Sequence, residues 1–135
     1  PQTAILNDIA EKVGREHRVR TMVTNWWAIC SDVTLKVFGE DGGHAGWNEN
    51  AFIQAIDPKL VHRERYSDSL ATPRPAAGTW SAYPFPSPII LYQPRQGYVK
   101  FDQAKADQYL KAVVEKMTEL VQETIAKWDA SHIFR

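Results

Sequence analysis

The spacing of hydrophobic and polar residues predicts three helices along the chain. Apolar residues recur every three or four positions over residues 3–17, with charged side chains between them, and they do so again over residues 47–56. Pro58 marks the end of the second helix. The longest apolar stripe runs over residues 101–128, and we expect this helix to be a structural element that covers a sheet.

Two further segments predict strands. Residues 19–29 are rich in β-branched and aromatic side chains, and the adjacent apolar residues Met22 and Val23 are typical of a parallel strand that is covered on both faces. Residues 89–92 predict a second, short and buried strand. A helix that leads into a buried parallel strand favours the α/β class.

The segments between these elements predict loops and surface. We expect residues 30–40 to form a loop into a glycine-rich turn, which then lies beyond a strand end, where open α/β sheets usually bind ligands. Residues 60–71 are mixed in charge and predict surface with one short strand. Residues 72–88 combine five prolines with three aromatic residues, which excludes a helix and predicts an ordered, extended loop that packs on a neighbour or serves function.

Length and charge narrow the class of protein. A chain of 135 residues with 44% hydrophobic and 24% charged residues suits one domain with one modest core. Sixteen basic residues balance sixteen acidic ones, so no net field is available to hold a polyanion. Nucleic acid and anionic membrane are therefore poor partners, and we expect a small-molecule ligand.

Cysteine content and hydropathy indicate the compartment. Cys30 is the single cysteine, which excludes an internal disulfide and fits a reducing compartment. No apolar run approaches the roughly 20 residues that a membrane helix requires. We therefore predict a cytoplasmic protein. The sequence begins with Pro1 rather than Met and shows no signal peptide, so we expect a further segment to precede it.

The stretch from residue 39 to residue 50 carries the chemistry. It holds four of the seven glycines, one histidine, His44, and three carboxylates, Glu40, Asp41 and Glu49. A histidine that exchanges a proton near neutral pH suits acid–base catalysis of hydrolysis. Two simpler roles stay open: His44 as a turn residue bonded to a backbone carbonyl, and Glu49 as a helix-stabilising charge worth under about 1 kcal/mol.

The sequence of this stretch resembles the signature of a known family. His44-Ala45-Gly46-x-x-Glu49 resembles the His-Ala-Gly-x-x-Glu-Thr-Ser motif of the creatininase family, which consists of metal-dependent amidohydrolases. Residues 23–27 resemble the strand and aromatic pair before this motif, and residues 55–61 resemble the Pro-x-Leu-Val run after it. Asn50 and Ala51 stand where the signature has Thr and Ser.

The resemblance implies an α/β fold with three layers, a mostly parallel sheet flanked by helices. In the family, a Glu-x-His motif, a metal-binding Asp and an Asn-Gly-His-Gly-Gly-Asn-type motif lie upstream of the matching region, and none of them occurs here. We therefore expect residues 1–135 to form the C-terminal half of a single creatininase-like domain, with the N-terminal half as its partner. The resemblance also implies a homo-oligomer, commonly a hexamer.

The resemblance also implies roles for individual residues. His44 matches the catalytic histidine that contacts the substrate, and Asp41 matches a residue of the substrate pocket. Trp27 resembles the tryptophan that closes over the substrate, with a core aromatic as the alternative role. Glu40 stands where creatinine-hydrolysing members place an aromatic residue against the substrate. Glu49 matches a residue at the edge of the metal centre, either a ligand or an acceptor that orients a ligand histidine.

Three functions follow as candidates. The first is a metal-dependent hydrolase that opens a small cyclic amide or related cyclic carbonyl compound with metal-activated water. The expected metal is divalent: zinc, with manganese or iron as alternatives. The second is a ring-opening C–C hydrolase of a polar, inositol-derived cyclic ketone. The third is a non-catalytic assembly subunit that binds a partner through residues 80–88.

Overall fold

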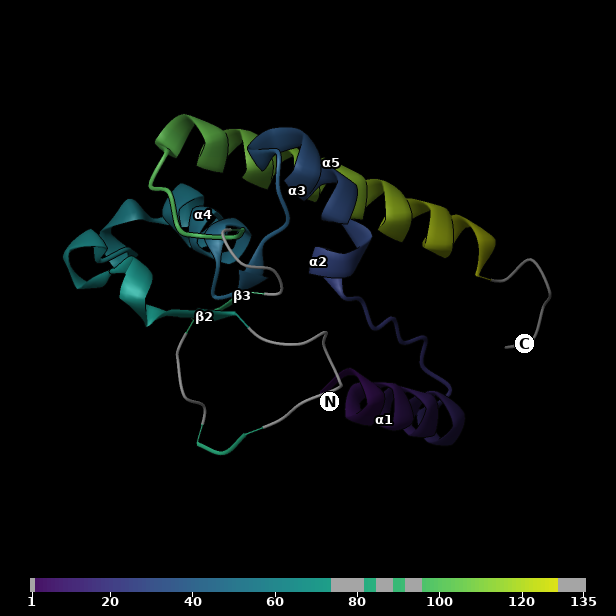
Figure 1. Cartoon of the computed structure of the whole chain (residues 1–135). Helices are drawn as coiled ribbons and strands as arrows, with labels where there is room; N and C mark the ends of the chain where they lie inside the picture. The colour runs from purple at the N-terminus through teal and green to yellow at the C-terminus, as the bar shows by residue number, and fades with distance from the viewer. Residues whose placement is uncertain (1, 74–81, 85–88, 92–95, 129–135) are drawn as a thin grey trace.

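The structure is a computed structural model that describes residues 2–73, 82–84, 89–91 and 96–128. Three helices come first, and short strands and two further helices follow (Figure 1). The α-helices are α1 Gln2–His17, α2 Trp26–Ile29, α3 Ser31–Phe38, α4 Trp47–Ile56 and α5 Gln103–Lys127. The strands are β1 Gly43–His44, β2 Ala71–Pro73 and β3 Ile89–Leu91, and 3-10 turns η1 Pro58–Leu60, η2 Arg63–Arg65 and η3 Asp68–Leu70 connect α4 to β2. The three helices expected from the sequence are confirmed as α1, α4 and α5.

The sheet is small and mixed. Its order is β1-β3-β2, with β1 antiparallel and β2 parallel to the central strand β3. Every residue of β3 is buried, which confirms the expected short buried strand for residues 89–91, while Tyr92 lies outside the described residues. The combination of helices and sheet agrees with the α/β class. The described residues do not show the expected three-layer, mostly parallel sheet.

The core lies where α3 and α4 pack against α5 (Figure 1). Tyr109 of α5 is fully buried at its centre, with the ring centroid of Phe38 at 5.0 Å. Phe38 in turn lies 4.5 Å from the ring of Trp47, the first residue of α4. The expectation that the long helix covers a sheet is wrong, because its buried residues face helices α3 and α4. This packing fixes the N-terminal end of α4, next to β1.

The strand expected over residues 19–29 is wrong. Residues 18–25 are irregular, and Trp26 begins the short helix α2. Val19 and Met22 are 43% and 37% exposed, so they do not fill the interior of a sheet. β-propensity reports how well a side chain fits a half-buried pleated surface, and in the described residues no neighbouring strand supplies that surface here.

The loop expected over residues 30–40 is also wrong, because residues 31–38 form α3. Val33, Val37 and Phe38 are buried at helical spacing and face the core. Gly39 ends the helix with φ of 80°, a left-handed C-terminal residue for which glycine is favoured. The glycine-rich turn therefore follows a helix and not a strand end.

Helix α1 is joined to the rest by the irregular residues 18–25 (Figure 1). Its apolar residues Ile5, Leu6 and Ile9 are 60%, 51% and 52% exposed. The helical periodicity was therefore a correct guide to secondary structure there, although the described residues do not bury that face.

Two other expectations concern the surface. Residues 60–70 are mostly exposed and form 3-10 turns before the short strand β2, in agreement with the expected surface segment. Most of the proline-rich segment 72–88 lies outside the described residues, and within it Tyr83 is 99% exposed. None of the helices in the described ranges combines the length and apolar character that crossing a bilayer requires.

Candidate functional site

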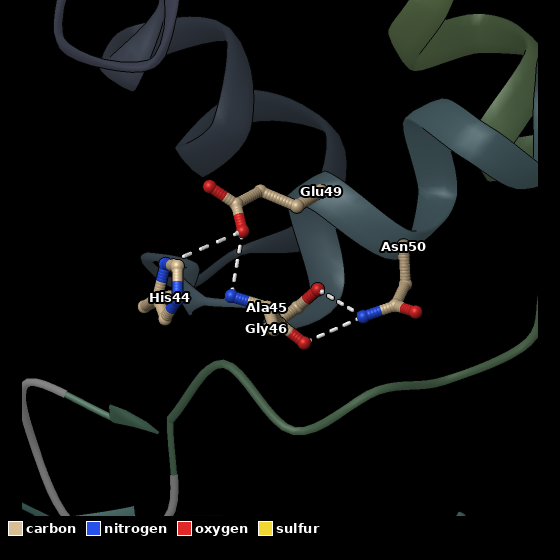
Figure 2. A network of polar contacts seen from close by, with 5 residues as sticks. All are labelled: His44, Ala45, Gly46, Glu49 and Asn50. Carbon is tan, nitrogen blue, oxygen red and sulfur yellow. Dashed lines mark hydrogen bonds and ion pairs between the residues drawn. The ribbon is translucent and has the colours of Figure 1, made fainter. Parts of the chain in front are cut away.

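His44 and Glu49 lie on either side of a tight turn between β1 and α4 (Figure 2). His44 is the last residue of β1 and pairs with Ile90 of the buried strand β3. Glu49 lies in the first turn of α4. His44 Nδ1 is 4.0 Å from Glu49 Oε2, so the two central residues of the sequence motif are brought together.

The turn depends on an unusual backbone and on close approach. Ala45 has φ of 54°, in the left-handed region that residues other than glycine seldom adopt. A Cβ on Gly43 would lie 2.6 Å from the carbonyl oxygen of Ile90, and one on Gly46 would lie 2.7 Å from that of Gly97. Both glycines are required because backbone from β3 and from the segment before α5 passes against the turn.

Two side chains of α4 bind the backbone of the turn. Glu49 Oε2 accepts a hydrogen bond from Ala45 N at 2.5 Å. Asn50 Nδ2 donates to the carbonyl oxygens of Ala45 and Gly46, at 2.5 Å and 3.0 Å. Figure 2 shows the two side chains reaching back to the turn from successive positions of the helix. The arrangement is close to a capping box, in which an acidic side chain in the first turn satisfies a free N–H before the helix.

The histidine is open to solvent. Its side chain is 60% exposed, and that of Glu49 is 35% exposed. Two surface cavities of the described chain lie at the C-terminal end of α5 and beside α1, and none of the five candidate residues lines either of them. The ring is therefore accessible to a small molecule, and it lies on open surface outside both cavities.

Glu40 belongs to a different cluster. Lys100 Nζ lies 3.3 Å from Glu40 Oε1, and the Glu40 side chain is only 19% exposed. The same ammonium group lies 4.3 Å from the ring centroid of the buried Trp47, with Lys105 Nζ at 5.2 Å. Glu40 therefore balances the charge of a lysine held on an indole face, and no hydrogen bond or ion pair within the described residues joins it to His44.

Within the described residues, no polar or ring contact joins Trp27 or Asp41 to His44. Trp27 is 47% exposed on α2, and its ring packs edge-on against Trp26 at 6.1 Å. The alternative role of a core aromatic therefore fits Trp26 better than Trp27, because Trp26 is half-buried against the core, with its ring tilted at 5.0 Å from that of Phe52. Asp41 is exposed, three residues before His44.

The residues present do not fit a metal centre. A protein zinc site usually requires three or more ligands from His, Cys, Asp or Glu. His44 and Glu49 supply at most two, and within the described residues no group of three such side chains lies together. Glu49 Oε2 already accepts the Ala45 N–H, so its observed role is to hold the turn.

Sequence reasoning missed the contributions of Asn50 and Lys100. From the sequence, Asn50 is a departure from the signature, although asparagine near a helix N-terminus often bonds local backbone. That signal was available in the sequence. Lys100 lies 60 positions from its partner Glu40, and no local pattern links the two residues.

A comparison with known families identifies a match over most of the chain. The family model Creatininase, described as creatinine amidohydrolase, matches residues 1–122 of the 135-residue chain. Searches of curated proteins and of solved structures found no match.

Proposed function

The chain belongs to the creatininase family, and on that premise we propose that it acts in hydrolysis of a small cyclic amide or related cyclic carbonyl compound, with His44 as the proton-transferring residue. The family suggests a metal-dependent amidohydrolase. The observation that carries the proposal is the position of the exposed His44 ring beside Glu49. The ring lies on a turn whose conformation depends on residues of the signature.

His44 supplies the acid–base chemistry in this proposal. Opening a cyclic amide adds the OH of water to the carbonyl carbon and breaks the C–N bond, and the leaving nitrogen must receive a proton. Glu49 Oε2 lies 4.0 Å from Nδ1, beyond hydrogen-bond distance, and the 60% exposure of the His44 side chain leaves the ring accessible to a substrate. In the proposed step, the His44 imidazole takes the proton that water loses as its OH bonds to the carbonyl carbon. The resulting imidazolium gives that proton to the leaving nitrogen as the C–N bond breaks.

Asp41, Glu40 and Trp27 are proposed to contact the substrate, by their match to the family. The pairing of Glu40 with Lys100 supports a second candidate within the class. A charged pair there, in place of the aromatic residue of creatinine-hydrolysing members, favours a polar ring with hydroxyl groups. Ring-opening C–C hydrolysis of an inositol-derived ketone is the alternative reaction.

A divalent metal, with zinc as the first choice and manganese or iron as alternatives, needs ligands from outside the described residues. We propose that these ligands lie in a polypeptide that carries the Glu-x-His and Asn-Gly-His-Gly-Gly-Asn motifs, which completes the α/β domain. The chain by itself is then expected to be inactive. A homo-oligomer, hexameric by resemblance, and a cytoplasmic location are further proposals from the family.

The test compares two histidines that both lie beside a glutamate. His62 Nδ1 is 3.1 Å from Glu64 Oε1 on the exposed turn η2, away from the signature, and so provides a matched control. Hydrolysis of creatinine, other cyclic amides and cyclic polyol ketones is measured for the assembled enzyme and for its His44→Ala and His62→Ala variants. We expect His44→Ala to lower kcat by about 100-fold or more and His62→Ala to leave it unchanged. Full turnover in His44→Ala would contradict the proposal.

The non-catalytic alternative is decided by the same variants. An assembly subunit that binds a partner through residues 80–88 does not depend on His44. Unchanged turnover in His44→Ala, together with loss of oligomer when residues 80–88 are replaced by a glycine-serine linker, would favour the assembly role. Loss of turnover in His44→Ala with the oligomer intact would favour the enzyme.

A further inference from the structure

We propose that Asn50 is a positioning residue: its side-chain amide holds the turn at residues 44–46 in the single conformation that orients His44. The catalytic consequence rests on the proposed function. The effect on the conformation of the turn does not, and it is measurable without any substrate.

The hydrogen bonds of Ala45 carry this inference. Its N–H donates to Glu49 Oε2 at 2.5 Å, and its carbonyl oxygen accepts from Asn50 Nδ2, also at 2.5 Å. Both polar groups of one peptide residue are thus bound by side chains from the first turn of α4 (Figure 2). Because Ala45 has φ of 54°, a conformation unfavourable for alanine, these bonds oppose its relaxation to another backbone conformation.

Contacts with neighbouring side chains do not hold His44 in place. The ring is 60% exposed, so few neighbouring atoms restrict its position. Its distance from Glu49 is set by the backbone of the next residue, Ala45, and by the pairing of β1 with β3. The strand fixes the N-terminal side of the turn. The Asn50 amide, bound to two successive carbonyl groups, fixes the other side.

The chemistry of the amide distinguishes Asn50 from the threonine of the signature. An asparagine amide carries two N–H donors, and the threonine of the signature carries one hydroxyl donor. Only the amide can bind both carbonyl groups at once. An aspartate has almost the same shape but, when ionised, no donor, and its charge would repel the two carbonyl oxygens.

The experiment uses a graded series at Asn50 and a matched control. Asn50→Asp removes both donors with little change of shape, Asn50→Ala removes them without adding charge, and Asn50→Thr retains one. Asn7→Asp makes the same chemical change at an exposed position of α1. Amide hydrogen exchange of Ala45 is measured by NMR for each variant, with circular dichroism to confirm folding.

We expect Ala45 exchange to accelerate at least about tenfold in Asn50→Asp and Asn50→Ala, because the turn opens more often. Asn50→Thr should fall between these variants and the wild type, and Asn7→Asp should match the wild type. Ala45 exchange within twofold of the wild type in both Asn50→Asp and Asn50→Ala would overturn the proposal. If Asn50→Asp fails to fold, the Ala45 exchange rate in Asn50→Ala alone decides whether the proposal holds.

Kinetics then separate this inference from the proposed function. If His44 is catalytic, the Asn50 variants should lower kcat with KM nearly unchanged, and Asn50→Thr should restore part of the loss. If His44→Ala retains full turnover, the proposed function fails while the exchange result still decides the role of Asn50. If His44→Ala is inactive and Asn50→Ala keeps both wild-type kcat and wild-type exchange, the positioning role fails alone.

Discussion

The hydroxyl groups of Thr34 and Tyr109 lie 2.8 Å apart in the core, although 75 positions separate the two residues. Thr34 Oγ1 also donates to the carbonyl oxygen of Cys30 at 3.2 Å. A threonine hydroxyl has one hydrogen, so Tyr109 is the donor to Thr34 when Thr34 binds Cys30. This chain of bonds joins α3 to α5, the helix that also packs against α4 and thereby supports the turn that carries His44.

Replacing Tyr109 with phenylalanine removes the donor of this pair. Thr34 keeps its bond to the Cys30 carbonyl oxygen, so the Thr34 hydroxyl is not left without a partner. We expect a loss of about 1 kcal/mol in the free energy of unfolding, the typical net value of one hydrogen bond. Urea denaturation measures it, and a double-mutant cycle with Thr34→Val isolates the pair. A coupling energy of zero would show that the bond contributes nothing.

Alkaline pH should destabilise the protein. Burial raises the pKa of the Tyr109 hydroxyl and the pKa of the Cys30 thiol, and it raises the pKa of Tyr66 to about 12. Groups with a raised folded-state pKa contribute stability that is complete below the unfolded pKa, roughly 8.5 for cysteine and 10 for tyrosine, and is lost at higher pH. Unfolding free energies measured from pH 7 to pH 11 should fall from about pH 8.5 upward. A flat profile would contradict this assignment.

The Cys30 thiol should react slowly in the folded protein. It has no exposed surface, and its pKa is raised first by burial, an effect that the nearby Lys116 partly offsets. Only the thiolate is nucleophilic, so both features suppress alkylation. Iodoacetamide at pH 8 should modify the unfolded chain faster by a factor on the order of 100 or more, because reaction requires opening of the core. Mass spectrometry follows the rate, and similar rates in both states would show that the thiol is accessible.

Alanine at Gly46 and alanine at Gly39 should differ in cost. A Cβ on Gly46 would meet the backbone of two segments at 2.7 Å, whereas a Cβ on Gly39 would have open space around it. Gly39 instead has φ of 80°, so alanine there costs about 1–2 kcal/mol of conformational energy. We expect Gly46→Ala to cost at least about 3 kcal/mol, at the upper end of overpacking, and to loosen the His44 turn. Thermal denaturation ranks the variants, and the reverse order would mean that the turn is loosely packed.

The sequence by itself determined the local features of this protein. Apolar periodicity was sufficient for α1, α4 and α5, because a helix repeats its contacts every three or four residues. Pro58 and Asp57 fixed the end of α4 for the same local reason. The signature around His44 indicated the family. His44 and Glu49 are only five positions apart, so their proximity could also be expected from the sequence.

Tertiary structure decided the rest. Residues 19–29 have the composition of a strand, but no partner strand lies beside them in the described residues, so α2 and irregular backbone form instead. Glu40 meets Lys100 across 60 positions, and Thr34 meets Tyr109 across 75. The left-handed Ala45 persists where β3, Gly97 and the Asn50 amide converge on one turn. Such contacts depend on which distant segments pack together, and the order of neighbouring residues does not encode them in any local pattern.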